Sequence, residues 1–264
     1  MAHEFETRYL LALKNILTGS KKKDRTGAGT RSKFGITFDI NLKEGFPILT
    51  TKEINFESVK KELLWFLRGE TNINSLGSKI WNPWANAHGE LGPIYGKQWR
   101  SWPSDEGPID QIEQVLRLIR EDPASRRIVV SAWNVADLPK MALPPCHVLF
   151  QFYVEGENLS CSVYQRSADM FLGVPFNISS YSLLLHLVAI ATSKYAHRLV
   201  WHGGDCHIYQ NHLDQVELQL TREPFPPPGI LITKEHEKVE NYSSNEIILL
   251  DYVHHSKINA EVSV

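Results

Sequence analysis

The stretch from residue 143 to 181 reads LPPCHVLFQFYVEGENLSCSVYQRSADMFLGVPFNISSY and contains four side chains suited to covalent chemistry. They are the thiol of Cys146, the guanidinium of Arg166, the carboxylate of Asp169 and the carboxamide of Asn177. A thiol is nucleophilic only as thiolate, and an ordinary pKa of about 8.5 leaves little thiolate at neutral pH. A fixed guanidinium favours the anion, so Arg166 would activate Cys146 if the fold brings the two together.

The residues between the thiol and the guanidinium predict a β-hairpin. Residues 148–154 and 159–166 are rich in β-branched and aromatic side chains and alternate with polar ones, while residues 155–158 form a turn that contains a glycine. Two such arms pair antiparallel, which brings the start of the first level with the end of the second. We therefore expect Cys146 beside Arg166.

His147 directly follows Cys146, which suggests a Cys–His hydrolase. Neighbouring side chains of an extended segment point to opposite faces, so His147 is a poor base for Cys146. The alternative interpretation of Cys146 is a buried structural cysteine.

Size and composition indicate a globular protein. The chain has 264 residues, 42% of them hydrophobic and 22% charged, and its net charge of −2 gives no basic field for nucleic acid. Three cysteines without metal-ligand spacing predict no zinc site and fit a reducing cytosol. No signal peptide is evident, and the longest apolar run, 182–191, is interrupted by His186. We expect a cytoplasmic protein without a metal, nucleic-acid or membrane partner.

Hydrophobic periodicity predicts the remaining elements. Helices are expected over residues 5–17, 56–68, 110–121 and 177–193, and after Tyr209. Strands are expected over 33–40, 128–133 and 199–201, and within 230–264.

Glu62 shares one flank of a predicted helix with the apolar residues Val59 and Phe66. A carboxyl group pressed against apolar surface has a raised pKa, which suits a proton shuttle. The alternative is a salt-bridged glutamate on the surface.

Further candidates are basic or aromatic. The glycine-rich turn DRTGAGT can bring Arg25 and backbone N–H groups to an anion. Arg126 and Arg127 precede an apolar strand, and adjacent guanidinium groups bind oxyanions bidentately, although a solvated pair is the ordinary alternative. Trp81 and Trp84 add two large aromatic surfaces, for which core packing is the alternative.

Longer motifs resemble one protein family over nearly the full chain. PPCH, LSC-VYQRSAD-FLG-PFNI-SY, GGD-HIYQNH, DRTG-GT, ELLWFLRG, GPIYGKQWR and SRRIVVSAWNV are similar to signature segments of the thymidylate synthases. The resemblance implies an α/β (α+β) fold in a single domain spanning residues 1–264. It also implies a mixed β-sheet surrounded by helices, whose outer face packs on a second subunit to give a homodimer.

The same resemblance implies an activity. It is the reductive methylation of dUMP by methylenetetrahydrofolate, which gives dTMP and dihydrofolate without a metal. Cys146 would add to C6 of uracil, Glu62 would act at the pyrimidine carbonyl with His147 nearby, and Tyr95 would help remove the C5 proton. Arg166, Asp169 and Asn177 complete the expected catalytic set.

The resemblance also implies how the ligands are held. The nucleotide phosphate would contact Arg25, Arg166 and Ser167, together with Arg126 and Arg127 donated by the neighbouring subunit. His207 and Tyr209 would hold the sugar hydroxyl, and Asn177 would hold uracil, because its carboxamide donates to O4 and accepts from N3–H. The folate would contact Ile80, Trp81, Trp84, Leu143, Asp169, Gly173, Phe176 and Ser263, the last within a tail, 260–264, that closes over the ligands.

Some positions depart from the family pattern. Asn82 stands where an aspartate is usual, and Glu53, Asn55 and Glu57 replace basic residues, which predicts a weak preference for polyglutamylated folate. Two other functions stay open. One is a pyrimidine hydroxymethylase, in which water replaces hydride, and the other is a non-catalytic nucleotide-binding paralogue.

Overall fold

A six-stranded mixed sheet organises the protein, as seen in a computed structural model that describes residues 4–263. Its strand order is β1-β2-β6-β5-β4-β3, and only β5 and β6 pair in parallel. The strands are β1 (Ser20–Lys22), β2 (Thr30–Asn41), β3 (Val129–Ser131), β4 (His147–Glu155), β5 (Asn158–Asp169) and β6 (Tyr195–Tyr209). The predicted α/β class with a mixed sheet is confirmed.

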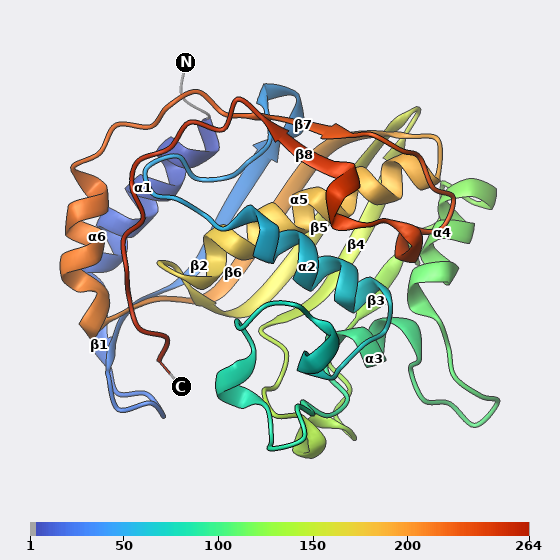
Figure 1. Ribbon diagram of the computed structural model, residues 1–264, viewed down its shortest axis with the longest axis horizontal. Helices are drawn as coiled ribbons and strands as arrows, with labels where there is room; N and C mark the ends of the chain where they lie inside the picture. Colours follow the sequence, from blue (N-terminus) through green and yellow to red (C-terminus); the bar gives the residue numbers. More distant parts are fainter. Residues whose placement is uncertain (1–3, 264) are drawn as a thin grey trace.

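Helices surround this sheet, with α2 and α5 crossing in front of it in Figure 1. They are α1 (Glu4–Leu17), α2 (Phe56–Leu67), α3 (Tyr95–Arg100), α4 (Gln111–Glu121), α5 (Gly173–Ala191) and α6 (Leu213–Leu220). A second, two-stranded sheet consists of β7 (Gly229–Ile232) and β8 (Ile247–Leu250). Short 3₁₀ turns cover Leu42–Glu44, Ile73–Ser75, Asn82–Trp84, Leu138–Lys140, Gln210–His212, Val239–Asn241 and Ser244–Glu246.

The central helix α5 is long and apolar enough to cross a membrane by length and composition alone. However, 78% of its most apolar window is buried inside the protein, so it is the core helix on which the sheet packs. It begins at Gly173, not at Asn177 as predicted, because Pro175 lies in its first turn, where a missing N–H breaks no helical hydrogen bond. Asn177 therefore projects from the second turn.

The predicted hairpin is confirmed as β4 and β5. Phe150 pairs with Val163, and the backbone N–H of Arg166 donates to the carbonyl of Cys146 at 2.8 Å. The thiol and the guanidinium thus belong to adjacent strand ends, although a whole hairpin separates them in sequence.

The strand predicted over residues 199–201 is present, but it is longer than predicted. The strand β6 begins at Tyr195 and continues through Gly203 and Gly204 to Tyr209, so His207 lies in a strand. The glycines permit close packing here: a Cβ at Gly203 would lie 2.3 Å from the ring of Trp201.

One face of the hairpin is open to solvent. Leu149 and Tyr164 are opposite each other in the register, and Tyr153 lies four residues after Leu149 on the same face of β4; these side chains are 38%, 40% and 64% exposed. Phe150 and Phe152, on the opposite face, are buried in the core.

Candidate active site

A single cavity of about 600 Å³ gathers nearly all the predicted site residues. It lies where the ends of β4, β5 and β6 meet the start of α5 and the loops before α3. The predicted residues that line it are Arg25, Glu62, Ile80, Trp81, Trp84, Tyr95, Leu143, Cys146, His147, Arg166, Ser167, Asp169, Gly173, Phe176, Asn177, His207, Tyr209 and Ser263.

Arg166 is fixed against the segment that carries Cys146. Its Nε donates to the carbonyl of Pro145 at 2.8 Å, and its Nη2 donates to that of Pro144 at 3.0 Å. The guanidinium also lies over the ring of Trp133, 5.2 Å from the centroid. The two prolines therefore supply the carbonyl groups that orient the guanidinium.

Burial dominates the electrostatics of Cys146. It raises the pKa of the thiol above its ordinary value, while the positive charges of Arg166 and Arg25 lower this pKa. The predicted influence of Arg166 has the right sign, but in the protein alone desolvation outweighs it.

Glu62 is buried in α2 and accepts a hydrogen bond from the indole N–H of Trp81 at 2.7 Å. Burial raises the pKa of Glu62 from 4.5 to about 7, and the bond from Trp81 opposes this rise. The predicted raised pKa agrees with the structure, whereas the alternative of a salt-bridged surface glutamate is wrong.

His147 belongs to a buried aromatic stack next to the thiol. Its ring stacks on Tyr95 with 4.0 Å between centroids, and its Nδ1 lies 2.7 Å from the hydroxyl of Tyr181. Burial lowers the pKa of His147 to about 3, so the ring is neutral. The hydroxyl of Tyr95 accepts a hydrogen bond from the backbone N–H of Cys146 at 2.8 Å, which places this phenol beside the nucleophile.

The glycine-rich turn holds Arg25 at the cavity. Asp24 organises the turn by accepting from the backbone N–H of Gly29 at 3.1 Å and from the hydroxyl of Thr26 at 2.7 Å. Lys22, just before the turn, forms an ion pair with Asp205 at 3.0 Å. This end of the cavity is therefore rich in cations, as an anionic group requires.

The opposite wall is aromatic. The rings of Trp81 and Trp84 meet edge to face with 5.6 Å between centroids. The indole N–H of Trp84 is buried and has no hydrogen-bond partner within residues 4–263. Asp169 accepts from the backbone N–H groups of Phe171 at 3.0 Å and Leu172 at 3.2 Å, which holds its carboxylate at the start of α5.

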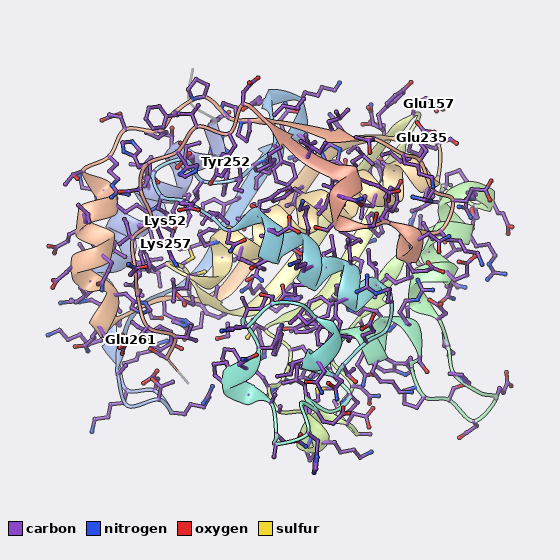
Figure 2. All side chains as sticks on the ribbon, viewed as in Figure 1. Lys52, Glu157, Glu235, Tyr252, Lys257 and Glu261 are labelled. Atoms are coloured by element: carbon purple, nitrogen blue, oxygen red, sulfur yellow. The ribbon has the colours of Figure 1, made fainter. Side chains whose placement is uncertain are left out.

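The C-terminal segment is tied along the molecule before it reaches the cavity, and Figure 2 shows Tyr252, Lys257 and Glu261 along its course. The hydroxyl of Tyr252 donates to Leu49 at 2.8 Å, and the Nε2 of His212 donates to the carbonyl of Glu261 at 2.7 Å. Val262 and Ser263 then line the cavity. The last residue of the predicted tail, Val264, lies outside the described residues.

Arg126 and Arg127 do not line the cavity of their own chain. Both side chains are exposed on the segment before β3. Within residues 4–263 no cluster of three or more His, Cys, Asp and Glu side chains is arranged to hold a metal ion. The three cysteines are free thiols.

Sequence reasoning missed several residues of the cavity. They are Lys22, Lys23, Asp24, Thr26, Thr30, Gln165, Leu172 and Asp205. Gln165 could have been found, because it lies two positions before Ser167 on an alternating strand and so shares its face.

Comparison with known proteins identifies the family. The thymidylate synthase family matches residues 7–264 of the chain. A thymidylate synthase of Wigglesworthia glossinidia brevipalpis is 54% identical over 258 residues, which cover 96% of this chain and 97% of that protein. The match extends over nearly the full length of both proteins, and the mixed sheet is consistent with it. The chain therefore belongs to the thymidylate synthase family.

Proposed function

We propose that this methyltransferase converts dUMP and methylenetetrahydrofolate to dTMP and dihydrofolate. The observation that carries the proposal is the presence of Cys146, with Arg166 bound to its flanking prolines, and the buried acid Glu62 in one cavity. The family match supports the same reading.

Cys146 acts as the nucleophile. Its sulfur bonds to C6 of uracil, and the electron pair of the C5–C6 double bond moves toward O4, which makes C5 nucleophilic. The cations at this end of the cavity, Arg25 and Arg166, lower the pKa of the thiol and hold the phosphate of the nucleotide with Ser167.

Glu62 and Tyr95 transfer protons to and from the pyrimidine. With a pKa of about 7, Glu62 exchanges a proton with the pyrimidine carbonyl at neutral pH. The phenol of Tyr95 lies beside Cys146 and takes part in removing the C5 proton, after which the sulfur leaves C6. The neutral ring of His147 supports Tyr95 by stacking on it, and His207 and Tyr209 hold the sugar.

The aromatic wall fits the folate. Trp81, Trp84, Leu143 and Phe176 offer apolar surface, and the unpaired N–H of Trp84 offers a hydrogen-bond donor within it. When bound, methylenetetrahydrofolate supplies both the one-carbon unit and the hydride. Ile80, Asp169 and Gly173 border the same space, and Ser263 on the tail excludes water from it.

The active unit is a homodimer in the cytoplasm. The exposed face with Leu149, Tyr153 and Tyr164 supplies apolar surface for a second copy, and the exposed Arg126 and Arg127 suit donation to the partner's phosphate site. The free thiols suit a reducing compartment.

Product analysis tests the activity. The protein is incubated with dUMP and methylenetetrahydrofolate, and both products are quantified by chromatography; equal amounts of dTMP and dihydrofolate are expected. A hydroxymethylated nucleotide without dihydrofolate would overturn the proposal in favour of a hydroxymethylase. With 5-fluoro-dUMP and the folate, mass spectrometry should find a stable adduct on the peptide that contains Cys146, and the Cys146→Ala variant should show none.

A further inference from the structure

A buried chain of hydrogen bonds ends on Asn177. The indole N–H of Trp201 donates to Oε1 of Gln165 at 3.0 Å, and Nε2 of Gln165 donates to Oδ1 of Asn177 at 3.1 Å. Trp201 is 0% exposed and Gln165 is 2% exposed. The three residues come from β6, β5 and α5, so the contact exists only in the folded protein.

The direction of this chain is fixed at its far end. An indole N–H can only donate, so Trp201 requires the oxygen of Gln165 on its side. The amide nitrogen of Gln165 also donates to the carbonyl of Ser167 at 3.1 Å, and a carbonyl can only accept. Gln165 therefore has one orientation, in which its nitrogen faces Asn177.

This orientation decides how Asn177 is turned. If its carboxamide rotated by half a turn, two N–H donors would face each other in a buried place, where an unpaired polar group is costly. The oxygen of Asn177 must therefore face Gln165, which leaves its nitrogen and one oxygen lone pair for a ligand in the cavity.

We propose that Gln165, held by Trp201, is a positioning residue that makes the site select uracil over cytosine. The inference rests on the proposed function, in which Asn177 binds the pyrimidine. Uracil offers an acceptor at O4 and a donor at N3, which match the nitrogen and oxygen of Asn177. Cytosine offers a donor at N4 and an acceptor at N3, which match the carboxamide only after it has turned.

The fold makes room for this relay, the hydrogen-bonded chain from Trp201 through Gln165 to Asn177. A Cβ at Gly203 would lie 2.3 Å from the ring of Trp201, so a glycine is needed where the indole lies against the backbone of its own strand. Gln165 pairs with Gly203 in the parallel register between β5 and β6. The hydrogen-bonded chain from Trp201 to Asn177 therefore depends on Gly203, which lies two residues beyond the strand predicted from sequence.

The test compares dUMP with dCMP in Gln165→Met and Gln165→Glu variants. Calorimetry gives the dissociation constant of dCMP divided by that of dUMP, and product formation gives kcat/KM for dUMP divided by that for dCMP. Both ratios measure the preference for dUMP. Gln165→Met frees the carboxamide of Asn177 to turn, so both ratios should fall about tenfold or more below the wild-type values. Gln165→Glu places an acceptor beside Asn177, so its preference should move further toward dCMP.

Two further variants serve as second arm and control. Trp201→Phe keeps an aromatic ring but removes the donor, and its ratios should shift in the same direction as those of Gln165→Met. Ser182→Ala removes a buried hydroxyl on α5 that has no partner within residues 4–263, and its ratios should equal those of the wild type. Circular dichroism and thermal melting establish that each variant is folded.

The results separate the relay from the proposed function. Folded Gln165 variants that keep the wild-type preference would overturn the relay, and so would a wild type that binds dUMP and dCMP equally. A wild type that binds dUMP selectively but forms no dTMP would overturn the proposed function, while the binding ratios of the variants would still decide the relay.

Discussion

Trp81 donates its indole N–H to the carboxylate of Glu62 at 2.7 Å, with both side chains buried. The proposed folate wall and the proposed proton shuttle are therefore one hydrogen-bonded unit. Burial raises the pKa of Glu62 to about 7, and the bond from Trp81 limits that rise. Changes on the folate side of the cavity should consequently alter proton transfer on the nucleotide side.

The Trp81→Phe variant should raise the pKa of Glu62. Loss of a hydrogen bond to the charged form, worth about 1 kcal/mol or more, corresponds to roughly one pKa unit. The pKa is measured from the carboxyl stretch in infrared difference spectra, with the Glu62→Gln variant used to assign the band. Trp84→Phe is the matched control, because its indole N–H has no partner within residues 4–263. An unchanged Glu62 pKa in Trp81→Phe would contradict the coupling.

The Glu62→Gln variant should be inactive yet more stable at alkaline pH. Native Glu62 holds its proton more tightly than unfolded Glu62, since burial raises its pKa from 4.5 to about 7. The native state therefore binds more protons in this range, so the wild type loses stability as pH rises through it. Above pH 8 the amide should raise the free energy of unfolding by up to about 3 kcal/mol, and at pH 4 it should change little. Urea denaturation of the variant and the wild type at each pH measures their free energies of unfolding. A difference between the two proteins that is the same at both pH values would refute the prediction.

The proposed sharing of active sites between two subunits predicts recovery of activity on mixing. Cys146→Ala and an Arg126→Ala/Arg127→Ala double variant should each be inactive as homodimers. After subunit exchange a mixed dimer has one site that contains Cys146 and receives both arginines, so random mixing should restore about a quarter of wild-type activity. Spectrophotometric detection of dihydrofolate reports the recovery. A mixture as inactive as its components would show that the arginines do not cross between subunits.

Polyglutamylated folate should gain little affinity over the monoglutamate. Glu53 and Asn55 are exposed before α2, where Asn55 caps the helix by accepting from Ser58 at 3.0 Å. Glu57 is an ion-pair partner of Lys60 at 2.7 Å, which makes Glu53 the better target for mutation. In Glu53→Lys the ratio of monoglutamate to triglutamate dissociation constants should rise several-fold at low salt and less at high salt, by fluorescence titration. A wild type that already gains strongly from each added glutamate would contradict this prediction.

The sequence by itself determined the local elements and most of the site. The alternation on either side of Gly156 specified the hairpin, and antiparallel pairing then placed Arg166 beside Cys146, because strand register follows from turn length. The apolar flank of α2 predicted the raised pKa of Glu62, since burial of a helix face buries every side chain on it.

Only the tertiary structure decided the features that depend on contacts between distant elements. The strand predicted from sequence ended at Trp201, yet the glycines after it let the indole pack closely while β6 continues to Tyr209. Burial outweighs Arg166 at Cys146, because desolvation depends on all surrounding atoms and not on one partner. The orientation of Asn177 likewise comes from Gln165 and Trp201, two residues on neighbouring strands whose meeting no local pattern encodes.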